Sequence, residues 1–332
     1  MRFSWHQLFS PVSRSWIVRP LETFIKKLQN KVIAGPIVSK LNRDFEKLAL
    51  ETEPEIIFVY RGTHIFPETL ARLKLKLPKM VLVGYNNDDP FGSSHSYWLW
   101  RHFLPSIPLY DLMLAFRHSN LEQFRQAGVK QAELLRAWFT PWHDAPMELA
   151  GADLEKFGAE VVFVGHYEPD GRLEALEEAA KTGAKLRIFG PGYEWDSVVA
   201  GSESLKHLLP VNTVWGGDYR KALCGAKIGL CFLSKLNNDT YTQRCFEIPA
   251  AGTMLLSEYT DDLATLFREG VEADFFRSKE ELAAKLKLYL GDEALRRRVA
   301  EKGRQRVIAD GHDVVSRARL VLAWAGAIRL EK

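Results

Sequence analysis

The sequence has few cysteines, no long apolar run and a small net charge, and each of these absences excludes a class of protein. Its 332 residues include only three cysteines, Cys224, Cys231 and Cys245, whose spacing is not that of metal ligands. We therefore expect a protein of the reducing cytoplasm. No apolar run reaches the roughly 18 residues that a membrane span requires, and the first residues lack an apolar segment followed by a small-residue cleavage site, which predicts no secretory signal. The net charge of +3 is too small to indicate nucleic acid as a partner.

The composition is that of a globular protein, with 46% hydrophobic and 26% charged residues. The length suffices for two domains that each bury a core. Short apolar segments alternate with amphipathic ones, a pattern typical of α/β domains with parallel sheets. Strands are expected at 56–60, 80–85, 112–116, 133–135, 160–164, 185–189, 227–232 and 253–256. Helices are expected at 67–76, 96–103, 120–127, 242–251, 263–268, 279–290, 293–309 and 314–328, with another that ends at Gly183.

The segment 140–153 contains Pro and Gly with little periodicity and is the best candidate for a linker. We therefore predict a lead segment with a helix at 1–50, a first domain at 51–148 and a second domain at 149–332. A receptor fold of the periplasmic-binding type would show the same alternation, so the candidate sites must decide the function.

The lead segment is basic and aromatic. Residues 1–31 contain six Lys or Arg and a single acid, Glu22, with Trp and Phe residues interleaved. Such a segment can lie on an anionic membrane surface, which predicts a peripheral position at the inner face of the membrane. The alternative is a solvated arm that packs loosely on the first domain.

Polar side chains follow three successive strands of the first domain, where parallel sheets bind ligands. The candidates for a catalytic base are His64, Asp88, Asp89 and His118. Each has a structural alternative; Asp89 before Pro90, for example, suits a helix cap. Asp88 and Asp89 are adjacent, so their side chains point apart on an extended chain, and we expect no metal site there.

Residues 242–258, TQRCFEIPAAGTMLLSE, are the most informative part of the sequence. A carboxylate, Glu247, lies in an apolar helical turn that leads through small residues and Gly252 into a short strand. This order suits a nucleotide pocket, because a helix end faces an anion, small residues admit ligand close to the backbone, and a carboxylate accepts from a ribose diol. An ordinary helix-to-strand connection with a surface Glu would read the same way.

Several fragments resemble GT-B glycosyltransferases, and within them the CgeB-like (spore-maturation-type) group related to families 1 and 4. They are RGTHIFPETL, VGYNNDDPF, LMLAFRHSNLEQFRQAG, IGLCFLSKLNNDTYTQRCFEIPAAG and LRRRVAEKGRQRVIADGHD. The resemblance implies two Rossmann-like domains facing across a cleft, no cofactor, and transfer of a sugar, of hexosyl type, from a nucleotide-activated donor to a hydroxyl group of a glycan, lipid or protein. It also implies that no metal is needed.

The resemblance also implies a donor site in the second domain. Asp239 and Glu247 have the spacing of the family's Glu-x7-Glu motif, in which the second carboxylate binds ribose and the first contacts the sugar; Asp at 239 departs from that motif. Arg172, Lys235 and Arg244 are expected near the diphosphate, and Gly165 and Gly252 along the backbone that faces the donor.

One departure concerns the first domain. The family begins with a strand and a glycine-bearing loop, whereas this chain begins MRFSWHQLFSPVSRSW, with no comparable apolar strand before Ile56. We therefore expect a first domain that is abbreviated at its N-terminus, with an exposed strand flank. A catalytically silent protein that binds a nucleotide sugar or a glycan is the alternative function.

Overall fold

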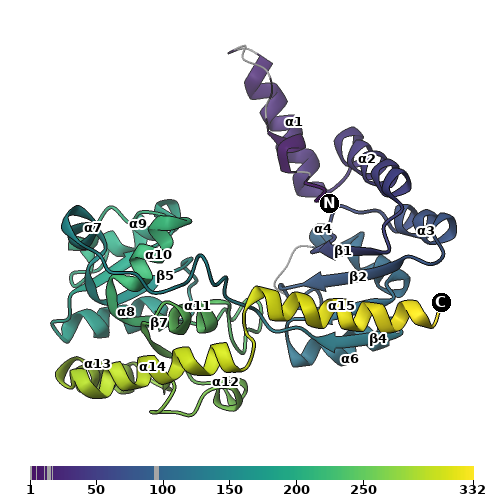
Figure 1. The fold of residues 1–332 in the computed structure, drawn as a ribbon. Coiled ribbons are helices and arrows are strands. Elements are labelled where there is room, and N and C mark those ends of the chain that lie inside the picture. The colour runs from purple at the N-terminus through teal and green to yellow at the C-terminus, as the bar shows by residue number, and fades with distance from the viewer. Residues whose placement is uncertain (1, 5, 11, 13–15, 17, 93–96) are drawn as a thin grey trace. The chain divides into compact units, whose positions relative to one another are not determined.

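A computed structural model describes residues 2–4, 6–10, 12, 16, 18–92 and 97–332. The chain forms two compact units, one of residues 1–136 with 319–332 and one of residues 137–318 (Figure 1). The bounds of these units differ from the predicted domains, because the last part of the C-terminal helix contacts the first unit. No helix in the described ranges is long and apolar enough to cross a membrane.

The first unit is built on a four-stranded parallel sheet whose strands follow one another in chain order, β1-β2-β3-β4. All four strands lie where the sequence predicts them, within one or two residues. Their bounds are β1 Ile56–Tyr60, β2 Val81–Asn86, β3 Leu112–Ala115 and β4 Gln131–Leu134. The helices are η1 His6–Phe9, α1 Val18–Val32, α2 Pro36–Thr52, α3 Pro67–Lys76, α4 Tyr97–Trp100, α5 Phe103–Ser106, η2 Ile107–Leu109 and α6 His118–Gln126.

The helix predicted at 96–103 differs from the structure. Two short helices, α4 and α5, replace it, and Ser96 lies outside the described residues. Arg101 and His102 separate the two helices, and Nε2 of His102 bonds to the carbonyl of Ile33 at 2.9 Å. The break therefore coincides with a contact to the connection between α1 and α2.

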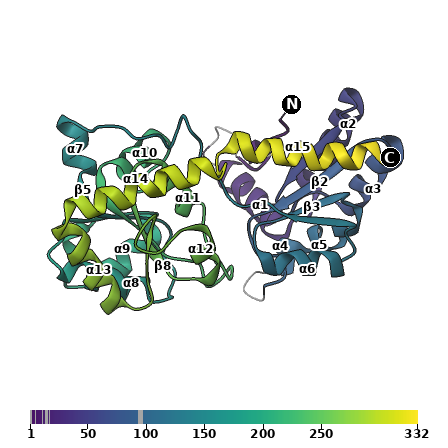
Figure 2. The same cartoon turned by 60° about the horizontal axis from the view of Figure 1, so that its bottom comes forward.

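Two sets of elements cover the two faces of this sheet. On one face, Ile57, Leu82 and Met113 pack into a cluster with residues of α2, α3 and α6. On the other face, alternate residues such as Val83 and Leu114 are fully buried, and α15 (Val314–Leu330) runs along this face (Figures 1 and 2). The C-terminal helix thus completes the core of the first unit.

Strand β1 forms one edge of the sheet and pairs only with β2. Phe58 and Tyr60 lie on its α15-side face and are 43% and 52% exposed. No described residue before Ile56 belongs to a strand. This edge strand has the exposed flank that the sequence analysis expects of the first domain.

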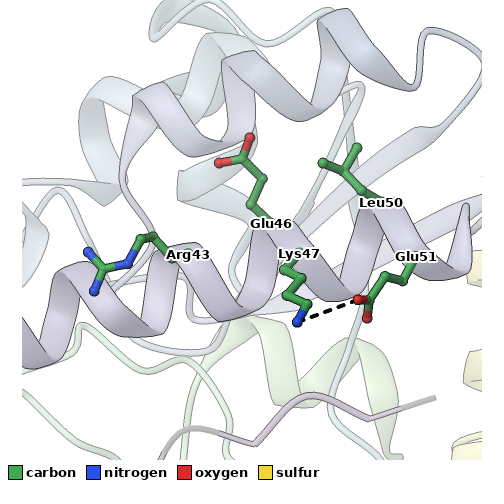
Figure 3. A pocket seen from close by; sticks show the side chains of 5 residues that line it. All are labelled: Arg43, Glu46, Lys47, Leu50 and Glu51. Carbon is green, nitrogen blue, oxygen red and sulfur yellow. Dashed lines mark ion pairs between the residues drawn. The ribbon is translucent and has the colours of Figure 1, made fainter.

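The outer surface of α2 carries a shallow hollow of about 380 Å³. Arg43, Glu46, Lys47, Leu50 and Glu51 line it (Figure 3). Two of these residues form an ion pair along the helix, Lys47 with Glu51 at 3.7 Å. Glu46 binds Arg72 and Lys76 of α3. Glu46 is therefore engaged in holding the two helices together.

The second unit contains a five-stranded parallel sheet of order β6-β5-β7-β8-β9. Its first strand, β5, lies between its second, β6, and its third, β7, so the winding direction reverses between β5 and β7. The strands are β5 Ala159–Val164, β6 Leu186–Phe189, β7 Ala226–Cys231, β8 Met254–Glu258 and β9 Asp274–Phe276. The helices are α7 Gly151–Phe157, α8 Arg172–Lys181, α9 Gly192–Ala200, η3 Lys206–Leu208, α10 Gly217–Cys224, α11 Arg244–Ala250, α12 Asp261–Leu266, α13 Lys279–Gly291 and α14 Glu293–Ala309.

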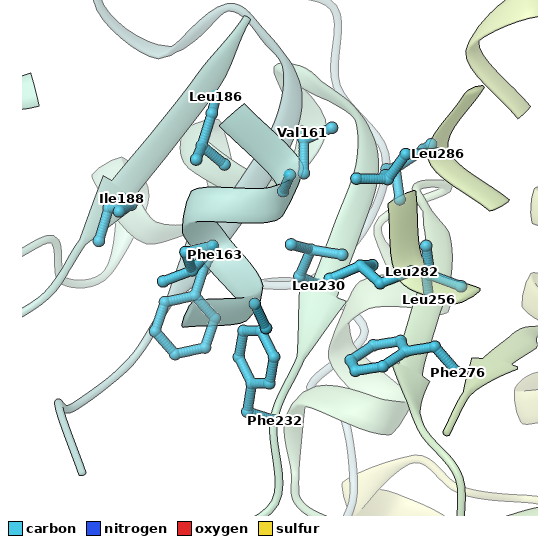
Figure 4. Packing of buried hydrophobic residues seen from close by; sticks show 14 of the residues in the cluster. Val161, Phe163, Leu186, Ile188, Leu230, Phe232, Leu256, Phe276, Leu282 and Leu286 are labelled. Atoms are coloured by element: carbon cyan, nitrogen blue, oxygen red, sulfur yellow. The ribbon is translucent and has the colours of Figure 1, made fainter. Parts of the chain in front are cut away.

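The core of this unit is formed by side chains of the sheet and of the helices that pack against it. Phe163, Leu230 and Leu256 from three neighbouring strands pack with Leu282 and Leu286 of α13 (Figure 4). Burial of such side chains contributes roughly 1.5–3 kcal/mol each. The sheet that carries the strand ends is thus held rigidly.

Candidate functional site

The reversal between β5 and β7 selects the place where a parallel sheet of this kind binds ligands, outside the carboxyl ends of these two strands. Gly165 follows β5 directly. A Cβ atom built on Gly165 would lie 2.8 Å from Cζ of Phe163 and 3.5 Å from the guanidinium carbon of Arg244. The first of these contacts is too short for a side chain, so glycine leaves room for the Phe163 ring, while the guanidinium lies at van der Waals distance from this strand end.

Arg244 is the first residue of α11, and its guanidinium is partly buried beside Gly165. Its Nε is buried and has no hydrogen-bond partner among the described residues. In the same ranges no carboxylate pairs with this guanidinium. The charge of Glu247 lies near the guanidinium without forming an ion pair with it. A buried N–H donor that has no acceptor favours an anion that can accept from it.

Glu247 follows one helical turn after Arg244 and is only 9% exposed. It accepts hydrogen bonds from the Tyr219 hydroxyl at 2.5 Å and from Nε2 of Gln243 at 2.6 Å. Burial raises the pKa of Glu247 to about 7, and the nearby charge of Asp144 acts in the same direction. The carboxyl group is thus held in one position by two neutral donors.

The other predicted cations of the second unit have partners. Arg172 is 3% exposed and binds Asp170 through Nε at 2.8 Å and Nη2 at 2.6 Å. It also donates to the carbonyl of His166 at 2.6 Å, which fixes the loop after β5. Lys235 pairs with Glu258 at 3.3 Å. Arg172 and Lys235 thus lie at the same sheet edge as Arg244, but each of them is paired with a carboxylate.

Asp239 and Gly252 differ in their distance from this edge. The loop after β7 carries Asp239, whose amide donates to the carbonyl of Ser234 at 2.9 Å. Gly252 precedes β8 and therefore lies at the opposite, N-terminal edge of the sheet. Its φ of +79° and its approach to Pro146 explain the glycine as a turn residue. Donor binding by Asp239 and Gly252 stays a prediction.

In the first unit, the predicted residues also gather at strand ends. Arg61 follows β1 with φ of +65°, and Gly62 donates to the carbonyl of Tyr60 at 2.9 Å in a three-residue turn. This rare turn points Arg61 toward Asp88, with which it forms an ion pair. Backbone strain of this kind clusters at functional sites.

Asp89 has a structural role in the turn after β2. Its Oδ1 accepts from the Phe91 amide at 3.1 Å and from Nδ2 of Asn120 at 2.9 Å, and the residue is 4% exposed. Asp89 therefore ties the turn after β2 to helix α6. Its neighbour Asp88 is the more accessible carboxylate of the pair.

The two histidines occupy different surroundings. His64 is buried between the Thr63 hydroxyl and Oδ1 of Asn30, each 2.9 Å from a ring nitrogen. His118 begins α6 on the surface, and its Nε2 lies 3.1 Å from Nη2 of Arg136. Since Arg is always a donor, this Nε2 is the accepting nitrogen. The described residues contain no cluster of three or more His, Cys, Asp or Glu that could hold a metal ion.

Sequence reasoning missed Tyr219 and Gln243 beside Glu247. Gln243 precedes Glu247 by four residues, a spacing that places two side chains on one helical face, so it could have been found. Tyr219 comes from α10, a helix that the sequence analysis did not predict. No local pattern joins it to a carboxylate 28 residues later.

A family model described as "Glycosyl transferase-like" matches residues 172–323. No curated protein matches the sequence. Among solved structures, HepE of Anabaena in complex with UDP-glucose is similar, with a TM-score of 0.64 and 14% identity over 88% of this chain and 84% of that one. Sucrose-phosphate synthase of Thermosynechococcus elongatus is similar with a TM-score of 0.64 and 13% identity, over 89% and 79% of the two chains.

A glycosyltransferase of Rickettsia africae gives a TM-score of 0.60 at 12% identity, over 88% of this chain and 81% of that one. Identities this low show the fold alone, and that fold is the predicted α/β, GT-B-like arrangement of two Rossmann-like domains. The family match does not reach the CgeB-like group. The chain thus has the GT-B fold, and its residues 172–323 are similar to the glycosyl transferase-like family.

Proposed function

We propose that this protein is a glycosyltransferase whose second unit binds the diphosphate of a nucleotide-activated sugar. One observation carries the proposal: the guanidinium of Arg244, whose buried Nε has no hydrogen-bond partner among the described residues, lies beside Gly165 at the winding reversal of the sheet. The match of residues 172–323 to a glycosyltransferase-like family supports it. HepE, which has the same fold, was crystallised with UDP-glucose, so a uridine nucleotide is the first ligand to test.

In this reaction the acceptor oxygen bonds to the anomeric carbon while the bond from that carbon to the diphosphate breaks. The diphosphate leaves with the electron pair, and the acceptor proton passes to a base. Arg244 stabilises the charge that develops on the leaving group, which is where fixed charges contribute most to catalysis. Glu247, held by Tyr219 and Gln243, accepts from the ribose hydroxyls.

The remaining roles belong to the same proposal. Lys235 assists at the diphosphate after it exchanges Glu258 for a phosphate oxygen, and Asp239 contacts a hexosyl group. Asp88, rather than the buried Asp89, is the base of choice in the first unit, with His118 as the second choice. The reaction uses no metal, and the protein acts in the cytoplasm. A CgeB-like relationship is part of this proposal.

The second candidate function is a catalytically silent protein that binds a nucleotide sugar or a glycan. The exposed edge of β1 favours it, because the first unit lacks a strand before Ile56 in the described residues. That sheet then provides fewer strand ends for an acceptor. Binding of the donor without transfer to any acceptor distinguishes this candidate from the first.

Thermal unfolding with UDP, UDP-glucose and a panel of other nucleotide diphosphates and nucleotide sugars tests the donor site. A ligand at a hundredfold excess over its Kd stabilises the folded state by about 2.7 kcal/mol, which is roughly 5–10 °C for a unit of this size. Arg244→Met should lose the shift. The matched control is Arg268→Met, an exposed arginine of the same unit that pairs with Glu272.

Three outcomes decide between the candidates. A shift in melting temperature that occurs in the wild type and the control, and is absent from Arg244→Met, supports the donor site. The nucleotide that causes the shift identifies the nucleobase of the donor. A full shift in Arg244→Met refutes the role of the guanidinium. A shift without release of nucleoside diphosphate in the presence of any sugar, glycerol or lipid hydroxyl acceptor favours the silent protein.

A further inference from the structure

Helix α1 (Val18–Val32) exposes its apolar face to solvent. Leu21, Phe24, Ile25 and Leu28 recur at helical spacing and are 62%, 64%, 44% and 48% exposed, and α1 contains no buried residue. Figure 1 shows the helix extending away from the sheet of the first unit. Soluble proteins rarely leave such a stripe uncovered, so the face has a partner.

Contacts within the first unit hold the opposite, polar face. Glu22 accepts from the Val12 amide at 3.0 Å, and Lys26 donates to the carbonyl of Ser10 at 2.7 Å. Near the end of the helix, Asn30 bonds to His64 at 2.9 Å. Because the polar side is engaged by the protein itself, the apolar stripe is held outward.

The charge around this stripe has one sign. Arg19, Lys27 and Lys31 are exposed and have no carboxylate partner among the described residues, while Glu22, the only acid of residues 1–31, pairs with Lys26 at 2.8 Å. A hollow of about 680 Å³ adjoins the stripe, and it is lined by Trp16, Arg19, Pro20, Thr23, Phe24 and Lys27. Cations beside exposed aromatic rings fit a headgroup phosphate above an apolar layer.

We infer that α1 lies on an anionic lipid bilayer, with Leu21, Phe24 and Leu28 among the acyl chains and Arg19, Lys27 and Lys31 at the headgroups. A second copy of this chain is the weaker occupant, because pairing two such helices brings like charges together. An anionic surface supplies both the apolar layer and the missing counter-charge. This inference is independent of the proposed donor site.

Co-sedimentation with vesicles of phosphatidylcholine alone, or of phosphatidylcholine mixed with phosphatidylglycerol, tests the inference on the full chain. Point variants are preferable to deletion of residues 1–30, because deletion removes Asn30 from His64. The variants are Phe24→Ser with Leu28→Ser, and Lys27→Glu with Lys31→Glu. The matched controls are Leu75→Ser, which is 82% exposed on α3, and Lys302→Glu on the exposed side of α14.

The wild type and both controls should bind the phosphatidylglycerol vesicles and release them at high salt. Each double variant should bind at least roughly tenfold more weakly, with unchanged circular dichroism and melting temperature. Equal binding of the wild type and both double variants overturns the inference. The inference is also overturned if the wild type does not bind the vesicles but forms a dimer in sedimentation velocity, and if Phe24→Ser with Leu28→Ser abolishes that dimer.

Discussion

Replacing Glu247 by Gln should stabilise the protein at alkaline pH. Burial raises the pKa of this carboxyl group from 4.5 to about 7 in the folded state. A group whose pKa is raised by folding contributes stability that is fully present below pH 4.5 and is lost as the pH rises through 7. Gln is uncharged at every pH, so the variant avoids this loss.

The size of the effect follows from the two pKa values. A difference of 2.5 units corresponds to about 3 kcal/mol at pH 8 and to less than about 1 kcal/mol at pH 5. The amide keeps the shape of the carboxyl group, and both Tyr219 and Gln243 can donate or accept, so their contacts with residue 247 persist. The stability of Glu247→Gln relative to the wild type should thus increase by roughly 2–3 kcal/mol between pH 5 and pH 8.

Urea unfolding of both proteins at pH 5 and pH 8 measures this difference. Glu269→Gln is the matched control of opposite sign. The hydrogen bond from Arg277 lowers the pKa of Glu269 to about 2, so its stabilisation is present above pH 4.5 and is lost as the pH falls through 2. Glu269→Gln should therefore be less stable than the wild type at pH 8. A stability difference for Glu247→Gln that does not change with pH refutes the reasoning.

Two further substitutions test the packing of the strand ends. Gly165→Ala places a methyl group 2.8 Å from the Phe163 ring, which should cost about 1–3 kcal/mol in urea unfolding. Because the clash displaces the end of β5, it should also weaken UDP binding in a titration, and binding at wild-type strength would contradict a donor site at this strand end. Arg172→Met leaves the carboxylate of Asp170, whose side chain is 7% exposed, without its partner and should cost about 3–5 kcal/mol. Loss of UDP affinity from Arg172→Met, without loss of stability, would instead assign Arg172 to the donor.

The sequence predicted well those features that depend on local patterns. All eight expected strands are present, because each is a short apolar run bounded by turn residues. Arg244 and Glu247 lie together, since a spacing of three places them on one side of a helix. The short strand β9 and the helices α7, α9 and α10 were not predicted; α10, for example, has only 8 residues and a weak apolar pattern.

Partners that are distant in the chain could not be predicted. His64 follows a strand like a catalytic residue, yet it packs against Asn30, which is 34 residues earlier. Asp89 is held by Asn120 of α6. Arg172 was expected to be available for a phosphate, whereas Asp170, two residues before it, binds its guanidinium. In each case the fold determines whether a polar side chain is available to a ligand or is bonded to another residue of the protein.

The C-terminal helix gives the first unit an unusual order of assembly. Val321 and Ala325 of α15 are buried, Arg329 pairs with Glu55, and Lys332 binds Asp111 at 2.9 Å. One face of this sheet is therefore covered by a helix that is separated from β4 in the sequence by the whole second unit. During synthesis on the ribosome, the sheet formed by residues 1–136 therefore has one apolar face exposed to solvent until the whole second unit has emerged. Loss of residues 319–332 alone should thus expose this apolar face and make residues 1–136 more susceptible to proteolysis.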